Sequence, residues 1–341
     1  MSTVQALGES AGAGNAHLLD VRHLTVRFPS PSGEVKAVED VSFSIQRGES
    51  IGIVGESGSG KTVTCLSLTW LLSSPPARYV SGKIVFDGTE LTRGNEKLVR
   101  KVRGRRIAMI FQNSRSTFDP SYRIGSQFAE VLRIHRGLSW REARPAVIET
   151  ILSCNVLDAE GVLDRFPHQV SGGVAQRAAI AMALLVRPDI LIADEPTTAL
   201  DLLTQLEVLM LLERVRAETG ASIIVVSHDL SVVKRIADRI LIMYAGRIVE
   251  DGPCADLFAK PQHPYTQALL VSAEQQMESG RLLELPGQPP DLSHLPGGCS
   301  FNPRCRHAFD RCYSEVPELY TTSPATRSRC FLSEKVNGPA S

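Results

Sequence analysis

The segment Gly55–Thr62 constrains the fold of this chain more than any other feature. It reads Gly-Glu-Ser-Gly-Ser-Gly-Lys-Thr, which matches the pattern G-x-x-x-x-G-K-T, and it follows the apolar run Ser50–Val54. A short apolar run is typical of a buried strand, and a helix is expected after the loop, from about Thr62 to Leu72. The glycines let backbone N–H groups turn inward, and the start of a helix adds positive potential. The unit therefore predicts a binding site for a triphosphate.

Each position in this loop has an expected role toward ATP. Lys61 would reach the β- and γ-phosphates, and the Thr62 hydroxyl would take one coordination position of Mg²⁺. An ordinary glycine-rich turn is the alternative, and the strand before the loop and the helix after it count against that alternative. The residues expected to contact ATP are Gly55, Glu56, Ser57, Gly58, Ser59, Gly60, Lys61 and Thr62.

A pair of carboxylates at the end of a second apolar run supplies the other half of the chemistry. The run Ile190–Ala193 is followed by Asp194 and Glu195. Parallel sheets bind ligands at the carboxyl edge of their strands. Asp194 is therefore the candidate partner of Mg²⁺, and Glu195 is the candidate base that polarises the attacking water. The alternative is an acidic pair that caps the next helix, which Pro196–Thr198 would also suit, but the phosphate loop favours the catalytic interpretation.

Apolar periodicity indicates an α/β core around these two sites. Residues Leu18–Ile45 alternate apolar and polar side chains, which is typical of antiparallel strands. Further buried runs lie at Ile223–Val226 and Ile240–Tyr244, and a helix is expected from about Leu203 to Glu218. Strands that alternate with helices in this way predict a doubly wound α/β sheet.

Two regions depart from this alternation. Between about residues 113 and 185, apolar residues recur at helical spacing, which predicts a helical lobe inserted into the core. After about Asp256, prolines and cysteines become frequent and periodicity fades, which predicts a separate C-terminal appendage. The expected boundaries are 1–16 for a disordered lead-in, 17–255 for the core with its lobe, and 256–341 for the appendage. The apolar positions of the lobe are Phe128, Val131, Leu132, Val147, Ile148, Ile151 and Leu152.

Composition counts against several classes of function. The 37 basic and 37 acidic residues cancel, so the overall charge does not indicate binding of nucleic acid. The short basic run Arg100–Arg106 is more typical of a solvated helix or hairpin face. No apolar stretch approaches the roughly 18 residues of a membrane span, and residues 1–16 lack the pattern of a signal peptide. A cytosolic location is expected, in which structural disulfides are rare.

Four more segments narrow the interpretation. They are Phe111-Gln112 after an apolar strand, Val170–Arg177 with its Ser-Gly-Gly, Ala199–Asp201, and Ser227–Asp229. Together with the phosphate loop and the carboxylate pair, their order resembles that of the ABC ATPases: Walker A, Q-loop, signature, Walker B, D-loop and H-loop. The resemblance covers about residues 18 to 335. It implies a P-loop NTPase (RecA-like) core with an antiparallel β subdomain, an inserted helical subdomain and a cysteine-containing appendage.

The resemblance also implies roles for residues at matching positions. Glu195, His228 and Gln112 would form the catalytic group, and Gln112 would join Thr62 and Asp194 around Mg²⁺. Phe28 would stack on adenine. The signature would close over ATP bound to a partner subunit, so a lone chain should hydrolyse ATP poorly. The residues at that seam would be Ser171, Gly172, Gly173 and Gln176 of the signature and Asp201 of the D-loop.

The signature departs from the family's usual pattern. Val170 stands where Leu is usual, Val174 where Gln or Met is common, and Ala175 where a basic residue is frequent. Because the Ser-Gly-Gly core is kept, the cradle would survive with weaker polar support. Our hypothesis is that the site capped by this signature is the slower of two.

The C-terminal region resembles the ATPases of oligopeptide and dipeptide importers. The resemblance rests on Pro261–Thr266, Leu285–Pro290 and Gly298–Cys305. That group also includes nickel, opine and glutathione importers. It implies a second, homologous ATPase subunit, two membrane permease subunits and, indirectly, an extracytoplasmic binding protein. The expected location is the cytoplasmic face of a bacterial inner membrane.

Four cysteines lie in this last region. Their gaps of five, six and seventeen residues are wider than the close pairs of zinc ribbons and also differ from bacterial ferredoxin spacing. The family resemblance implies a [4Fe–4S] cluster, with zinc or reduced structural thiols as the alternatives. The four residues are Cys299, Cys305, Cys312 and Cys330.

Other ABC ATPases are the competing interpretations. A soluble member acting on ribosomes or DNA would carry two ATPase domains or a long coiled coil, and this chain has one phosphate loop and no heptad run. An exporter would usually be fused to membrane spans. A regulatory subunit that does not hydrolyse ATP is disfavoured because Lys61, Asp194, Glu195 and His228 are all present.

Overall fold

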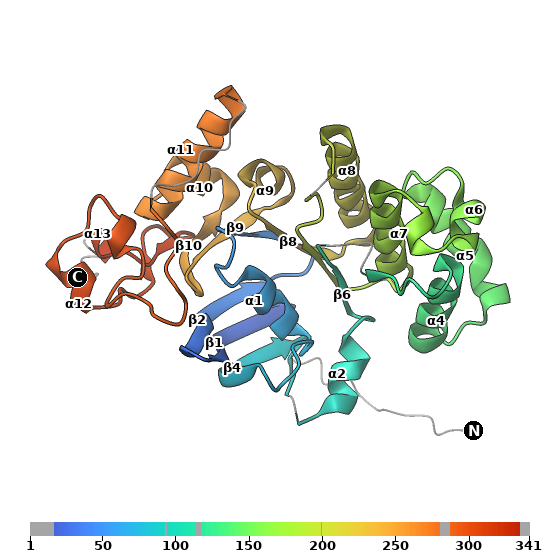
Figure 1. The fold of residues 1–341 in the computed structure, drawn as a ribbon, viewed down its shortest axis with the longest axis horizontal. Coiled ribbons are helices and arrows are strands. Elements are labelled where there is room, and N and C mark those ends of the chain that lie inside the picture. The colour runs from blue at the N-terminus through green and yellow to red at the C-terminus, as the bar shows by residue number, and fades with distance from the viewer. Residues whose placement is uncertain (1–16, 93, 113–116, 199, 280–286, 335–341) are drawn as a thin grey trace, which may run out of the picture.

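The computed structural model describes residues 17–92, 94–112, 117–198, 200–279 and 287–334. The predicted lead-in 1–16 lies outside these residues. Four strands form an antiparallel sheet in the order β2-β1-β4-β5, at the bottom of Figure 1. The alternation seen in the sequence buries the inward face of β1 and β2, as predicted. The strands are β1 (Leu19–Ser30), β2 (Gly33–Ile45), β4 (Arg78–Phe86) and β5 (Thr89–Glu90).

The second sheet is larger and carries the predicted buried runs. Its eight strands have the order β11-β12-β10-β9-β3-β8-β7-β6, and the five from β9 to β6 are parallel. This confirms the α/β core, because β3, β7 and β8 are buried along their whole length. The strands are β3 (Ser50–Val54), β6 (Ile107–Ile110), β7 (Ile190–Asp194), β8 (Ser222–Ser227), β9 (Arg239–Tyr244), β10 (Arg247–Pro253), β11 (Tyr320–Thr321) and β12 (Arg327–Ser328).

The helices around this sheet follow the predicted alternation with one difference in length. The first helix ends four residues earlier than expected, at Leu68. Trp70 has φ +53°, a left-handed conformation that a right-handed helix does not contain, and Pro75 follows shortly. The helices are α1 (Lys61–Leu68), α2 (Glu96–Val102), α8 (Leu202–Thr219) and α9 (Leu230–Ile236).

The helical lobe lies at one end of the molecule, on the right of Figure 1. Its core contains the predicted Phe128, Leu132, Val147 and Ile151, all buried. Leu152, which belongs to the same apolar spacing, is 45% exposed. The lobe consists of α4 (Ile124–Arg136), α5 (Trp140–Ser153), α6 (Ala159–Asp164), the 3₁₀ turn Pro167–Gln169 and α7 (Gly172–Leu185).

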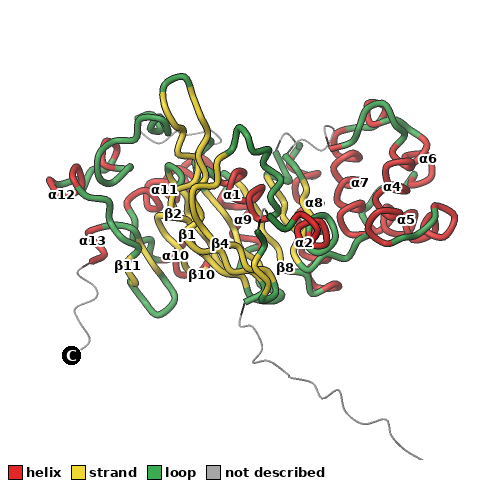
Figure 2. The backbone as a smooth tube through the Cα atoms, turned by 90° about the horizontal axis from the view of Figure 1, so that it is seen from below, coloured by secondary structure: helices red, strands yellow, loops and turns green. Residues whose placement is uncertain are grey.

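The C-terminal region lies at the opposite end of the molecule, and Figure 2 shows the strands between these two ends. It is more regular than its sequence suggested, since α11 has 16 residues and β12 pairs with β10 of the central sheet. The buried Glu250 of β10 accepts the N–H groups of Gln262 (2.6 Å) and His263 (3.0 Å), which ties the start of α11 to the core. The helices are α10 (Cys254–Ala259), α11 (Pro264–Ser279), the 3₁₀ turn Asn302–Arg304, α12 (Asp310–Ser314) and α13 (Phe331–Glu334).

Candidate functional site

The loop between β3 and α1 is held tightly against its neighbours. Gly60 has φ +101°, and a Cβ there would lie 2.3 Å from the carbonyl oxygen of Ala37. A Cβ on Gly55 would lie 2.2 Å from the carbonyl oxygen of Met243. Only glycine therefore fits at either position. The sequence pattern and the packing require the same two residues.

Lys61, the first residue of α1, is folded back over this loop. Its ammonium donates to the carbonyl oxygens of Gly55 (2.7 Å) and Glu56 (2.9 Å), and the residue is only 5% exposed. Burial lowers the pKa of Lys61, while the carboxylates of Glu195 and Asp194 oppose that shift. A buried cation thus lies inside a loop whose backbone turns around it.

The end of β7 brings the first carboxylate to the loop. The Thr62 hydroxyl donates to Asp194 Oδ1 at 3.2 Å, across 132 residues of sequence. Asp194 is 2% exposed, and burial raises the pKa of its carboxyl group, which the hydrogen bond from Thr62 and the charge of Lys61 partly offset. A hydroxyl and a carboxylate side by side are the oxygen donors that Mg²⁺ prefers.

The carboxylate of Glu195 contacts three other side chains. Its Oε2 accepts from Gln112 Nε2 (2.7 Å) and from the Thr198 hydroxyl (2.8 Å), and its Oε1 lies 3.3 Å from His228 Nδ1. The backbone of Glu195 has φ +47°, an uncommon conformation for a residue other than glycine. The ends of β6, β7 and β8 therefore bring Gln112, Glu195 and His228 together, which sequence spacing alone does not require.

The loop also contains a buried hydroxyl that can donate to a phosphate oxygen. Ser59 is 5% exposed, and its hydroxyl has no hydrogen-bond partner among the described residues. Unpaired buried hydroxyls are costly, so such an atom is commonly completed by a bound group. Ser59, the loop N–H groups and Lys61 together form a donor set suited to phosphate oxygens.

The signature segment forms a second, exposed helix start. The Ser171 hydroxyl accepts the Val174 N–H at 3.3 Å and caps α7, and a Cβ on Gly172 would meet nothing within 4 Å. Asp201 caps α8 in the same way, accepting the Thr204 N–H at 3.0 Å. Open helix starts of this kind can receive an anion from another molecule.

Two other residues singled out in the sequence have contacts within the chain. Gln176 is 3% exposed and donates to the carbonyl oxygen of Pro196 (3.0 Å), so it joins α7 to the segment after β7. Phe28 pairs with Val35 across β1 and β2 and is partly buried against the core of the antiparallel sheet. Their roles toward ATP stay predictions.

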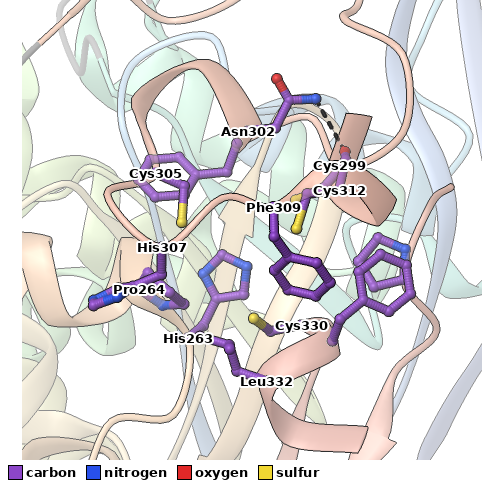
Figure 3. A pocket seen from close by; sticks show the side chains of 13 residues that line it. His263, Pro264, Cys299, Asn302, Cys305, His307, Phe309, Cys312, Cys330 and Leu332 are labelled. Carbon is purple, nitrogen blue, oxygen red and sulfur yellow. Dashed lines mark hydrogen bonds between the residues drawn. The ribbon is translucent and has the colours of Figure 1, made fainter. Parts of the chain in front are cut away.

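The four C-terminal cysteines line one small cavity of about 20 Å³, to which Phe331 also contributes. Figure 3 shows the four cysteines around this cavity with Phe309. The segment is held by the Asn302 amide, which donates to the carbonyl oxygens of Gly297 (2.7 Å) and Cys312 (3.1 Å). Within the described part of the chain, no three His, Cys, Asp or Glu side chains are placed to hold a metal ion. The four thiols therefore share one cavity.

Comparison with known proteins identifies this arrangement. Residues 38–198 match the model of the ABC transporter family, and residues 249–312 match the oligopeptide/dipeptide transporter C-terminal region. The chain is 42% identical to the oligopeptide transport ATP-binding protein OppD of Escherichia coli, over 92% of this chain and 93% of that protein. It is 41% identical to OppD of Haemophilus influenzae, over 94% and 99%. The chain belongs to the ABC transporter family of ATPases.

Solved structures of this family share the fold. A dimeric ATP-binding cassette with ADP and Pi, in a post-hydrolysis state, superposes with a TM-score of 0.62 at 26% identity, covering 69% of this chain and 98% of that one. A component of the cbiONQ transporter complex from Clostridium perfringens gives 0.60 at 25% identity, covering 78% and 97%. The ABC ATPase carries no helix in its described part that is long and apolar enough to cross a membrane.

Sequence patterns missed residues that hold this site in place. The Thr198 hydroxyl touches Glu195, and the only signal for it was its position three residues after the carboxylate. Arg304 and Tyr265 contact Glu56 of the loop from more than 200 residues away, and no sequence signal indicated those contacts.

Proposed function

We propose that this ABC ATPase powers the import of peptides as a nucleotide-binding subunit of a membrane transporter. The observation that carries the proposal is the match of residues 249–312 to the C-terminal region of oligopeptide/dipeptide transporters, together with the 42% identity to OppD. Nickel, opine or glutathione import by the same architecture is the alternative solute class. In this proposal the other subunits of the transporter select the solute.

In this proposal the hydrolytic residues act as a positioned acid–base group. Lys61 binds the β- and γ-phosphates. Thr62, Asp194 and Gln112 would hold Mg²⁺, which would neutralise charge on the phosphates. Glu195 accepts a proton from the attacking water as that water approaches the γ-phosphate. His228 and Gln112 hold the carboxylate and the water in line. Phe28 stacks on the adenine ring.

The second half of each ATP site would come from another subunit. Ser171, Gly172 and Gly173 present a helix start to the solvent, and the cassette of known structure with ADP and Pi is a dimer. We therefore propose that these residues, with Gln176 behind them and Asp201 beside them, close over ATP on a homologous partner. Valines flank the Ser-Gly-Gly core and give it weaker polar support. ATP bound to the partner and capped by this signature is therefore hydrolysed more slowly than ATP at the other site.

The proposed partners can be tested by isolating the complex. The chain would sit at the cytoplasmic face of a bacterial inner membrane, bound to two permease subunits. Affinity purification of the tagged full chain from its own membranes should recover a second ATPase and two permease chains. ATP hydrolysis of the reconstituted complex should rise with a peptide-loaded binding protein. A complex stimulated only by nickel, an opine or glutathione would replace peptides with that solute.

We further propose that the four C-terminal cysteines hold a [4Fe–4S] cluster. The four sulfurs line one cavity, and backbone N–H groups of Phe301, His307 and Leu332 donate to the sulfurs of Cys299, Cys305 and Cys330 respectively. Hydrogen bonds to sulfur are one of the means by which proteins tune clusters. Zinc bound by the same four thiolates is the alternative.

Anaerobic purification tests the cluster. The full chain should be brown and should absorb broadly at about 400 nm, as iron–sulfur proteins do. It should contain about four iron and about four sulfide ions per chain. Cys305→Ser should lose most of that absorbance, whereas Cys154→Ser, a buried cysteine of the helical lobe, should keep it. A colourless, iron-free chain would contradict the proposal, and zinc in its place would favour the alternative.

A further inference from the structure

The C-terminal region reaches the phosphate loop through Arg304. Its guanidinium makes two parallel contacts with the Glu56 carboxylate, from Nη1 to Oε2 (2.7 Å) and from Nη2 to Oε1 (2.9 Å). The Arg304 side chain is only 4% exposed, and the Glu56 side chain is 22% exposed. Fork-to-fork pairs of this kind fix geometry as well as charge. Glu56 is the second residue of the loop, so the pair fixes the loop at its beginning.

A second contact holds the backbone of the same residue. The Glu56 N–H donates to the Tyr265 hydroxyl at 2.9 Å. Tyr265 is fully buried at the start of α11, and its ring packs against Tyr244 at 4.6 Å and Phe301 at 5.4 Å between centroids. Arg304 Nη1 also donates to the Tyr244 hydroxyl at 3.3 Å. The rings and the guanidinium therefore form one rigid support beneath Glu56.

Charge gives this support a direct consequence for phosphate binding. The Glu56 carboxylate acts electrostatically on Lys61, so it lies within range of the phosphate site. An uncompensated carboxylate there would repel a polyanion, and Arg304 cancels it. The Glu56 carbonyl oxygen also accepts from Lys61 (2.9 Å), so a shift of Glu56 would move the lysine that binds phosphate.

We infer that Arg304 and Tyr265 are positioning residues for the phosphate loop, through which the C-terminal region sets nucleotide affinity. The inference rests on the phosphate site proposed above. Both residues act through Glu56, which each of them contacts directly. The role is therefore one of loop geometry and charge compensation, supplied by a segment outside the core motifs.

A double-mutant cycle on the full chain separates this role from a merely structural one. MgADP binding is measured by calorimetry for Arg304→Gln, Glu56→Gln and the pair. Arg304→Gln should weaken binding about tenfold, because one uncompensated charge remains near the phosphates. The double variant should bind MgADP more tightly than Arg304→Gln alone, since the uncompensated carboxylate is gone as well. Loss of a structural tie alone would predict no such recovery.

Two further variants complete the test. Tyr265→Phe keeps the ring and removes the acceptor of the Glu56 N–H, and should weaken MgADP binding about three- to tenfold. Arg311→Gln is the matched control, because it breaks ion pairs to Glu315 and Glu334 within the same C-terminal region, away from the loop. That variant should bind MgADP as the unaltered chain does.

The outcomes distinguish the inference from the proposed function. Failure of the unaltered chain to bind MgADP would overturn the phosphate site and the inference together. Normal binding by Arg304→Gln and Tyr265→Phe, or a double variant as weak as Arg304→Gln alone, would overturn the inference and leave the phosphate site standing.

Discussion

ATP hydrolysis by the assembled transporter should fall about 10²- to 10⁴-fold at this chain's site when Glu195 is replaced by glutamine, the range expected for loss of a general base. Glutamine has nearly the same shape and can keep a hydrogen bond with the Thr198 hydroxyl, which now lies 2.8 Å from Glu195 Oε2. It cannot accept the proton of the attacking water. Nucleotide binding should therefore stay within about threefold, because a neutral isostere removes no phosphate ligand.

The control for this variant is another carboxylate of the same chain. Glu213→Gln on α8 removes an exposed ion pair to Arg235, with Oε1 at 2.8 Å from Arg235 Nε, and should leave both hydrolysis and binding unchanged. The measurement is single-turnover hydrolysis of MgATP by the complex. Retained hydrolysis in the Glu195 variant, at a site shown to be filled, would remove Glu195 from the role of base.

Replacing Lys61 by alanine should weaken nucleotide binding about 10- to 100-fold, because charge-assisted hydrogen bonds to phosphate are lost. In the free chain this ammonium is held by the carbonyl oxygens of Gly55 and Glu56, so it already lies at the centre of the loop. Its loss also removes the positive charge of Lys61 that acts on the buried Asp194, which should further disfavour an anionic ligand.

Calorimetric titration with MgADP measures this effect. Lys61→Arg is an informative companion, because it keeps the charge but its planar guanidinium does not match the site of a compact ammonium, and it should also bind poorly. Lys97→Ala, on the exposed face of α2, is the control and should bind normally. Binding by Lys61→Ala at the affinity of the control would show that nucleotide is held elsewhere.

Local patterns singled out most of the residues that the structure brings together at the ends of β3, β6, β7 and β8. The loop Gly55–Thr62 and the pair Asp194-Glu195 each follow a buried strand, and parallel strands place their carboxyl ends at one edge. The contacts of Glu195 with Gln112 and His228 follow from that topology. Backbone details, such as the left-handed φ of Glu195, depend on packing and are absent from the pattern.

Long-range contacts were beyond the reach of sequence patterns. The Glu56–Arg304 pair spans 248 positions, and neither residue belongs to a periodic pattern. Helix α11 was missed because the proline and cysteine content around it outweighed its short apolar stripe. Pairing of β12 with β10, which joins the C-terminal region to the core, depends on two residues of each strand. These three features depend on tertiary packing, which local sequence patterns do not describe.

The most direct test concerns the claim that hydrolysis belongs to an assembled pair of subunits. MgATP turnover is measured at equal chain concentration for the purified chain alone and for the complete complex isolated from membranes. The complex should hydrolyse MgATP at least about tenfold faster per site than the lone chain. In the complex, the start of a signature helix, such as that at Ser171, lies over the γ-phosphate of the ATP bound to the neighbouring subunit. Equal turnover by the lone chain, independent of its concentration, would contradict this account.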